Sequence, residues 1–69
     1  MRREDLKKDL PVHYIPRHLK ETKGIDPNTG MDKREYGTIS SWNESFVFVD
    51  YPFKGGTQGT RIEDLEIIN

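Results

Sequence analysis

The sequence contains no cysteine, which excludes both disulfide bonds and thiolate metal sites. It also has no apolar run of the roughly 18 residues that a membrane-spanning helix needs. The charged residues 1–5 are not followed by an apolar stretch of signal-peptide length. We therefore expect a soluble protein of the cytoplasm that does not enter a membrane and has no covalent cross-links.

Net charge is also small. The 69 residues carry 11 Lys and Arg against 12 Asp and Glu, so the formal net charge is −1 at pH 7. Residues 1–23 hold seven basic and four acidic side chains, whereas residues 24–69 hold four basic and eight acidic ones. Strong nonspecific binding of nucleic acid depends on clustered Lys and Arg. The modest basic excess at one end is instead interpreted as a solvated terminus.

Apolar residues are concentrated in two parts of a chain that is long enough for a single domain. Residues 36–68 contain 13 of the 22 apolar residues, and residues 10–19 contain another five. Residues 20–35 contain only Ile25 and Met31, which is too little apolar surface to offset the entropy of ordering. We predict a long loop there that is either mobile or functional.

Residues 1–9 are predicted to form a short helix or a basic arm. Glu4 and Lys8 have the favourable i,i+4 spacing for a helix over residues 2–9. A helix of this length is not stable alone, so it should dock Leu6 on the rest of the domain.

Five short segments have the alternation, or the β-branched and aromatic content, that is typical of strands. Val47 and Val49 are predicted to face the core. Pro11 predicts that the first strand begins at a sheet edge, and Gly37 permits a bend or bulge in the second. The predicted strands are residues 10–15, 36–42, 46–51, 57–61 and 66–68.

One helical turn is predicted before the last strand, because Thr60 and Glu63 have the spacing of a capping box. A three-stranded meander, a short fourth strand, a 3-10 turn and a brief fifth strand follow one another in the order of an SH3-like barrel. The sequence thus predicts a mostly β fold. We expect a five-stranded SH3-like β-barrel domain over residues 10–69, with its long loop at residues 20–35.

Four segments of the chain form an ordered pattern: residues 12–18 (VHYIPRH), 37–43 (GTISSWN), 47–51 (VFVDY) and 58–65 (QGTRIEDL). This pattern resembles a family of short proteins of tailed bacteriophages and prophages, over roughly residues 10–66. The chain departs from the family at Gly59, where members carry Ala, at Ile62, where they carry Pro, and in its loop, which lacks a His and Cys cluster. The resemblance implies a phage origin and a barrel. It transfers no active site, because the function of the family is unassigned.

Residue types that serve in catalytic and metal sites are present, but their spacing does not bring them together. A nucleophile would come from Ser40, Ser41, Ser45 or a threonine, and a base from His13 or His18. Two histidines alone do not make a zinc site. The glycine-rich stretch before the last turn lacks the Gly-Lys-Ser/Thr ending of a phosphate-binding loop. We predict no enzymatic activity, no metal and no cofactor.

The seven aromatic residues exceed what so small a core encloses, and exposed aromatics in small barrels hold peptides or bases. Trp42 and Phe53 lie beside predicted turns, where both a core and a binding role stay open. Tyr51 is assigned to the core, and the amino-terminal helix is one candidate cover for Phe46 or Phe48. The candidate binding residues are Tyr14, Arg17, His18, Trp42 and Phe53.

We interpret the chain as a small phage-encoded, non-enzymatic binding module that contacts a host or phage protein in the host cytoplasm. A second interpretation is a nucleic-acid-binding barrel of the ribosomal or transcription-factor type, with Trp42 or Tyr14 stacked on a base. A third is a homo-oligomer that buries the surplus aromatic side chains in its own interface.

Overall fold

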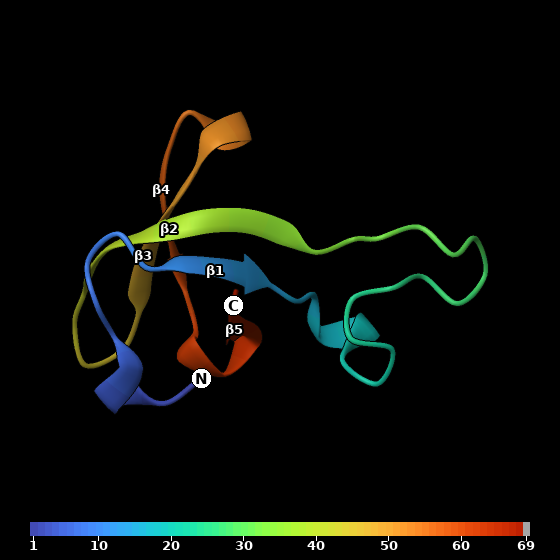
Figure 1. The fold of residues 1–69 in the computed structure, drawn as a ribbon, viewed down its shortest axis with the longest axis horizontal. Coiled ribbons are helices and arrows are strands. Elements are labelled where there is room, and N and C mark those ends of the chain that lie inside the picture. Colours follow the sequence, from blue (N-terminus) through green and yellow to red (C-terminus); the bar gives the residue numbers. More distant parts are fainter. Residues whose placement is uncertain (69) are drawn as a thin grey trace.

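Five antiparallel strands form one open sheet in the computed structural model, which describes residues 1–68. The strand order is β4-β3-β2-β1-β5 (Figure 1). The mostly β fold is confirmed, and so are all five predicted strands, each end within one residue of its predicted position. The strands are β1 (Pro11–Tyr14), β2 (Glu35–Trp42), β3 (Val47–Tyr51), β4 (Gly56–Thr60) and β5 (Leu65–Ile67).

The helical elements are short 3-10 turns: η1 (Arg3–Asp5), η2 (Arg17–Leu19), η3 (Pro52–Lys54) and η4 (Ile62–Asp64). The turn predicted before the last strand is confirmed as η4. Its predicted capping box is wrong, because Thr60 belongs to β4 and η4 follows Arg61, which provides no side-chain cap. The Thr60 hydroxyl oxygen lies instead 3.0 Å from the hydroxyl of Tyr51.

The helix predicted over residues 2–9 is wrong, since only η1 forms in that segment. Asp9 adopts a positive φ of 67°, and its N–H donates to the carbonyl of Ile39 at 2.7 Å. The N–H of Ile39 donates in turn to the carbonyl of Leu10 at 3.0 Å. These bonds hold the chain beside β2, and a helix of about two turns offers too few internal bonds to compete with them. Leu6 nevertheless packs against the core, as predicted.

Two details of the predicted strands are also corrected. Strand β1 lies between β2 and β5, so Pro11 does not mark a sheet edge. It takes the first position of the strand, where a missing N–H disturbs the ladder least. The irregularity in β2 lies between Ile39 and Ser41 rather than at Gly37. Gly37 serves close packing, because a Cβ there would lie 2.5 Å from Val49 Cγ1.

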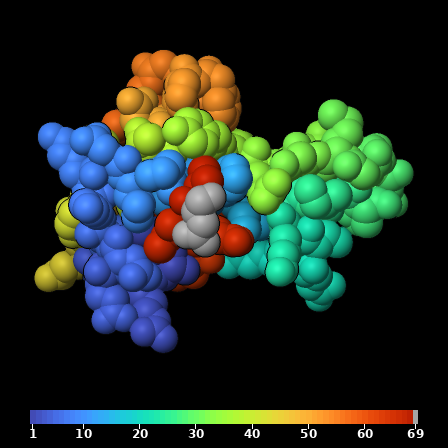
Figure 2. Space-filling model, in the orientation of Figure 1, coloured from blue at the N-terminus to red at the C-terminus, as the bar shows by residue number. Residues whose placement is uncertain are grey.

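The core lies on one face of the sheet. Strand pairing sets Val12 opposite Gly37 and Ile39 opposite Val49, and residues that face each other across strands share a face. The predicted inward position of both valines of β3 is confirmed, as is the core position of Tyr51. In Figure 2 the amino-terminal segment (blue) lies against the red segment that contains β5. The buried cluster consists of Val12, Ile39, Val47, Val49, Tyr51 and Leu65.

The long loop between β1 and β2 extends away from the sheet (Figures 1 and 2). Its base is held by Leu19, which is buried. Further out, a bridge pairs Ile25 with Asp32, and the N–H of Asp26 donates to the carbonyl of Met31 at 2.8 Å. The outer part of the loop is therefore a small hairpin with its own hydrogen bonds.

Candidate binding groove

A groove of about 420 Å³ opens on the core side of the sheet, between β4 and the turn η4. Its lining comes from residues far apart in the sequence, because β1, β2, β3 and β4 all contribute to it. Three cationic and three aromatic side chains meet there: Arg17, Lys54, Arg61, Tyr14, Phe46 and Tyr51.

The floor of the groove is built from buried polar groups. Thr60 and Asp64 are both buried, and the hydroxyl groups of Tyr51 and Thr60 lie 3.0 Å apart. Burial raises the pKa of the Tyr51 hydroxyl, while the hydrogen bond with Thr60 opposes the shift. Tyr51 therefore stays a neutral phenol at physiological pH and serves as a fixed hydrogen-bonding group at the floor.

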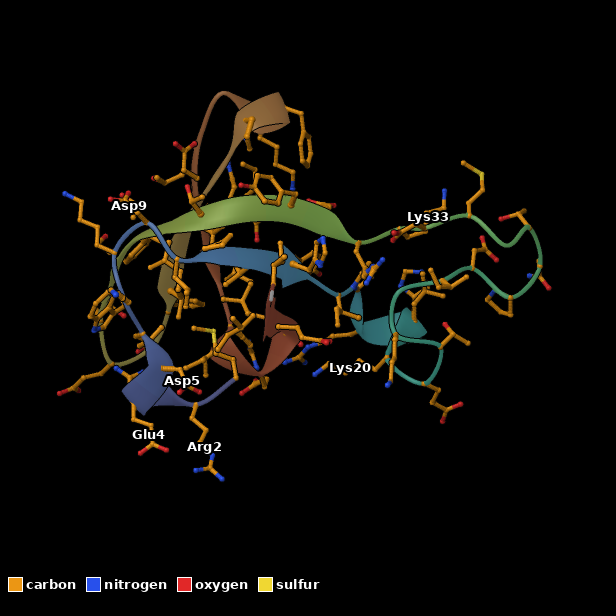
Figure 3. All side chains as sticks on the ribbon, in the orientation of Figure 1. Arg2, Glu4, Asp5, Asp9, Lys20 and Lys33 are labelled. Carbon is orange, nitrogen blue, oxygen red and sulfur yellow. The ribbon has the colours of Figure 1, made fainter. Side chains whose placement is uncertain are left out.

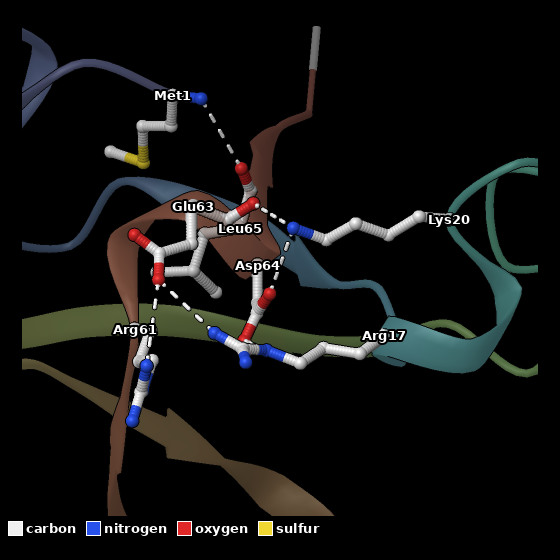
Figure 4. Close-up of polar contacts among 7 residues, drawn as sticks. All are labelled: Met1, Arg17, Lys20, Arg61, Glu63, Asp64 and Leu65. Carbon is white, nitrogen blue, oxygen red and sulfur yellow. Dashed lines mark hydrogen bonds and ion pairs between the residues drawn. The ribbon is translucent and has the colours of Figure 1, made fainter.

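Asp64 is the centre of a charged cluster that joins η4 to the start of the long loop (Figure 4). Its Oδ2 accepts a hydrogen bond of 3.3 Å from Arg17 Nε, and its Oδ1 lies 2.9 Å from Lys20 Nζ. Lys20 also donates to the carbonyl of Glu63 at 2.9 Å. Burial disfavours the charged form of Asp64, but the hydrogen bonds and charges of Lys20 and Arg17 outweigh it and lower the pKa. Asp64 is thus a fixed carboxylate.

Cations dominate the solvent-facing rim of the groove, whereas its carboxylates lie deeper. The side chains of Arg17 and Arg61 are 55% and 59% exposed, against 7% for Asp64. Lys54 is 39% exposed and pairs at 2.9 Å with Glu35, which is 28% exposed. The most exposed charges of the groove lining are therefore cationic, and each cation has at least one carboxylate within 4.0 Å.

Glu63 is the exception to this distribution. Its carboxylate is 57% exposed and lies 3.1 Å from Arg17 Nη2 and 3.9 Å from Arg61 Nη1. It does not line the groove itself but a second, neighbouring hollow. Phe46 lines both hollows and is 41% exposed, so an aromatic face joins them.

The structure brings together two of the five residues proposed from the sequence. Tyr14 and Arg17 line the groove, whereas His18, Trp42 and Phe53 do not. His18 is exposed on η2, Trp42 is 41% exposed at the end of β2, and Phe53 is 64% exposed on η3. The exposed aromatic residues are therefore distributed over several parts of the surface.

Sequence reasoning missed Phe46, Lys54, Gln58 and Arg61 as groove residues. Lys54 and Arg61 reach the same groove only because the chain reverses at Gly55, whose φ is 68°, and returns as β4. A signal for the two cations was present, since they flank an uncharged stretch that includes all of β4.

Within residues 1–68, no three side chains of His, Asp or Glu gather closely enough to hold a metal ion. No helix in the described part of the chain is long and apolar enough to cross a membrane. Comparison with protein-family models, with curated proteins and with solved structures found no match.

Proposed function

We propose that this chain is a non-enzymatic binding module with an SH3-like barrel, and that it contacts a partner protein through the groove beside β4. The strand order and the connections support the barrel: a long loop after β1, two short turns, and η4 before β5, which pairs with β1. The ordered sequence segments that resemble short proteins of tailed phages favour a phage origin. The proposed partner is a host or phage protein in the host cytoplasm.

The observation that carries this proposal is the composition of the groove. It combines exposed cationic ends with partly exposed aromatic faces over a floor of fixed polar groups. Arginine and aromatic side chains in one hollow are typical of the anchor sites of protein interfaces. In this proposal the chain binds a partner and catalyses no reaction.

Nucleic acid is the second candidate partner. Arg17, Lys54 and Arg61 line the same groove as Tyr14, whose ring would stack on a base. The other basic side chains do not extend this site into a larger basic surface, because several lie outside the groove and pair elsewhere in the protein. Arg2 pairs with Glu4 at 2.9 Å, Arg3 donates to the carbonyl of Asn43 at 2.9 Å, and Arg34 pairs with Asp32 at 2.7 Å. Arg2 and Lys33 also lie far apart in Figure 3, so they form no common basic surface.

The test compares two exposed phenylalanines. Phe46→Ala removes an aromatic face of the groove, and Phe53→Ala removes a more exposed ring outside it. Affinity capture from an infected host lysate should recover a protein with wild type and with Phe53→Ala, and roughly tenfold less of it with Phe46→Ala. Equal recovery by all three proteins would refute the groove as the contact site.

A salt titration separates the two candidate partners. Binding of mixed-sequence RNA or DNA that is micromolar and falls steeply with salt would favour the nucleic-acid-binding barrel. Sedimentation of the isolated protein tests the third interpretation, since a stable homo-oligomer would cover exposed aromatic side chains in the absence of any partner.

A further inference from the structure

The two edge strands of the sheet differ in what covers them. At one edge, β5 is contacted by the amino-terminal segment, where the amino group of Met1 donates to the carbonyl of Leu65 at 3.4 Å (Figure 4). At the other edge, β4 pairs only with β3 among the described strands. Four of its five residues are exposed.

Strand β4 also lacks the features that protect a sheet edge from pairing. Edge strands are usually blocked by charged side chains, proline or a covering segment. Between Gly56 and Thr60 there is no charged residue and no proline, and the strand contains two glycines. Gly56 is exposed, and a Cβ there would meet no atom within 4 Å, so the space beside this position is open.

The two faces of β4 offer different surroundings to the side chains of an added strand. Gln58 and Thr60 pair with Val49 and Val47, which places them on the core side, where the groove and its cationic rim lie. Gly59 pairs with Phe48 on the other side, where a Cβ at position 59 would lie 3.5 Å from Phe48 Cε1 and 3.7 Å from Phe46, which also borders the groove. One side of the added strand would thus meet cations and the other an aromatic ring.

From this arrangement we propose that β4 accepts an extended segment of the partner protein as a sixth strand, and that this segment alternates acidic with apolar residues. Side chains of a strand point alternately to its two faces, so carboxylates would reach Arg17, Lys54 and Arg61 while apolar side chains contact the phenylalanine side. This inference rests on the proposed function and specifies the partner segment.

A second copy of this chain fits the same edge less well. Its own β4 is uncharged, so pairing of two β4 strands would bring no carboxylate from that strand to the cationic rim. Charge complementarity therefore favours a segment of another protein, and self-association becomes an outcome of the test.

The first experiment blocks the edge. Successive amides of a strand point to opposite sides, so one of Thr57 and Gln58 directs its N–H away from β3. Thr57→Pro and Gln58→Pro are therefore both made, with Thr57→Ala and Gln58→Ala as matched controls. One proline variant should keep the wild-type denaturation transition, because an edge strand tolerates proline at an outward N–H. That variant is the one used for binding.

The second experiment supplies the probe. A library of random 12-residue peptides is selected against the immobilised full chain, and the tightest peptide is synthesised. We expect alternating acidic and apolar residues and slowed exchange of the amides of β4. The folded proline variant and Arg61→Glu should each bind roughly tenfold more weakly, as loss of a hydrogen bond or a charge contact predicts. Arg2→Glu, whose side chain is 82% exposed and outside the groove, should bind like wild type.

Each contrary result points to a different failure. If a selected peptide binds but the amides of β4 stay unprotected, the added strand is wrong and the proposed function stands. If no peptide is enriched while a mixed-sequence single-stranded DNA binds, both are wrong. If the amides of β4 are protected without peptide and the protein sediments as a dimer, a second copy occupies the edge and this inference is wrong.

Discussion

Arg17 Nε donates a hydrogen bond of 3.3 Å to Oδ2 of Asp64, across 47 positions of the sequence. This contact joins the turn at the start of the long loop to the turn that precedes the last strand. Lys20 reaches the other carboxylate oxygen of Asp64, so both ends of the carboxylate are held. These contacts fix the base of the long loop beside the groove, independently of the conformation of its outer part.

Asp64→Asn should destabilise the fold by about 1–2 kcal/mol at neutral pH, because it removes a charge-assisted contact with two cations. The pKa of Asp64 is lowered from its ordinary value of 3.8, so the folded state favours the carboxylate. A depressed pKa contributes stability that is present above the unfolded value and is lost as pH falls through the folded value. The difference between wild type and Asp64→Asn should thus shrink below about pH 4.

Urea denaturation at a series of pH values measures this difference. Glu44→Gln is the control, because that side chain is exposed and contributes only its backbone carbonyl to the hydrogen bonds of the turn. A difference for Asp64→Asn that stays constant down to pH 2 would show that its carboxylate is not held by the two cations.

Gly37→Ala should destabilise the protein by about 1–3 kcal/mol, the usual cost of overpacking. A Cβ at this position would lie 2.5 Å from Val49 Cγ1 and 2.9 Å from the backbone oxygen of Asp50, and a backbone atom does not move aside easily. Gly56→Ala is the matched control, since its Cβ would meet nothing within 4 Å. Equal denaturation midpoints for the two variants would contradict the close contact between β2 and β3.

The strands were predictable because their signals are local. The alternation of Val47 and Val49 with outward residues and the aromatic content of β3 are visible in a few residues of sequence. The spacing of Thr60 and Glu63 was an equally local signal, but the capping box that it predicted does not form. The Thr60 hydroxyl instead forms a hydrogen bond with the hydroxyl of Tyr51, nine residues earlier in the chain. The amino-terminal helix failed for a similar reason, since β2 offers that segment better hydrogen bonds.

The groove was harder to predict than the strands because it depends on contacts between distant segments. Tyr14 and Arg17 were selected from their own surroundings in the sequence, and both line the groove. Arg61 and Lys54 join them only through the turn after β3 and the pairing of β4 with β3. The sequence shows an uncharged stretch between Lys54 and Arg61, but it does not show that these two side chains reach the same groove.

Val49→Asp should abolish folding, because it places an unpaired carboxylate in a position with no solvent exposure. Asp50→Asn, one residue further along β3 and exposed, should leave the denaturation transition within about 0.5 kcal/mol of wild type. Circular dichroism during thermal denaturation measures both. A cooperative native transition for Val49→Asp would mean that the register of β3 is shifted by one residue.

The tip of the long loop should tolerate shortening. Asp26 and Met31 close the small hairpin, so replacing residues 27–30 by Asn-Gly keeps a standard two-residue turn. The entropic cost of closing a loop depends only weakly on its length, so the free energy of unfolding should change by less than about 1 kcal/mol. Leu19→Ala at the buried base should cost about 2–4 kcal/mol instead. Amide exchange should be faster at residues 28–30 than in β3, and equally slow exchange would show that the tip is folded over another part of the protein.

Trp42→Ala separates a surface tryptophan from a core one. The side chain of Trp42 is 41% exposed at the end of β2 and is absent from the buried cluster, so we expect a loss of about 1 kcal/mol in the free energy of unfolding. A core tryptophan would cost about 3–5 kcal/mol. Tyr51→Ala, which removes a buried ring of the core, is the comparison and should lose most of the stability. Because Trp42 lies outside the groove, its loss should also leave binding of the selected peptide unchanged. A binding defect of roughly tenfold or more with an intact fold would extend the binding surface from the groove to the turn after β2.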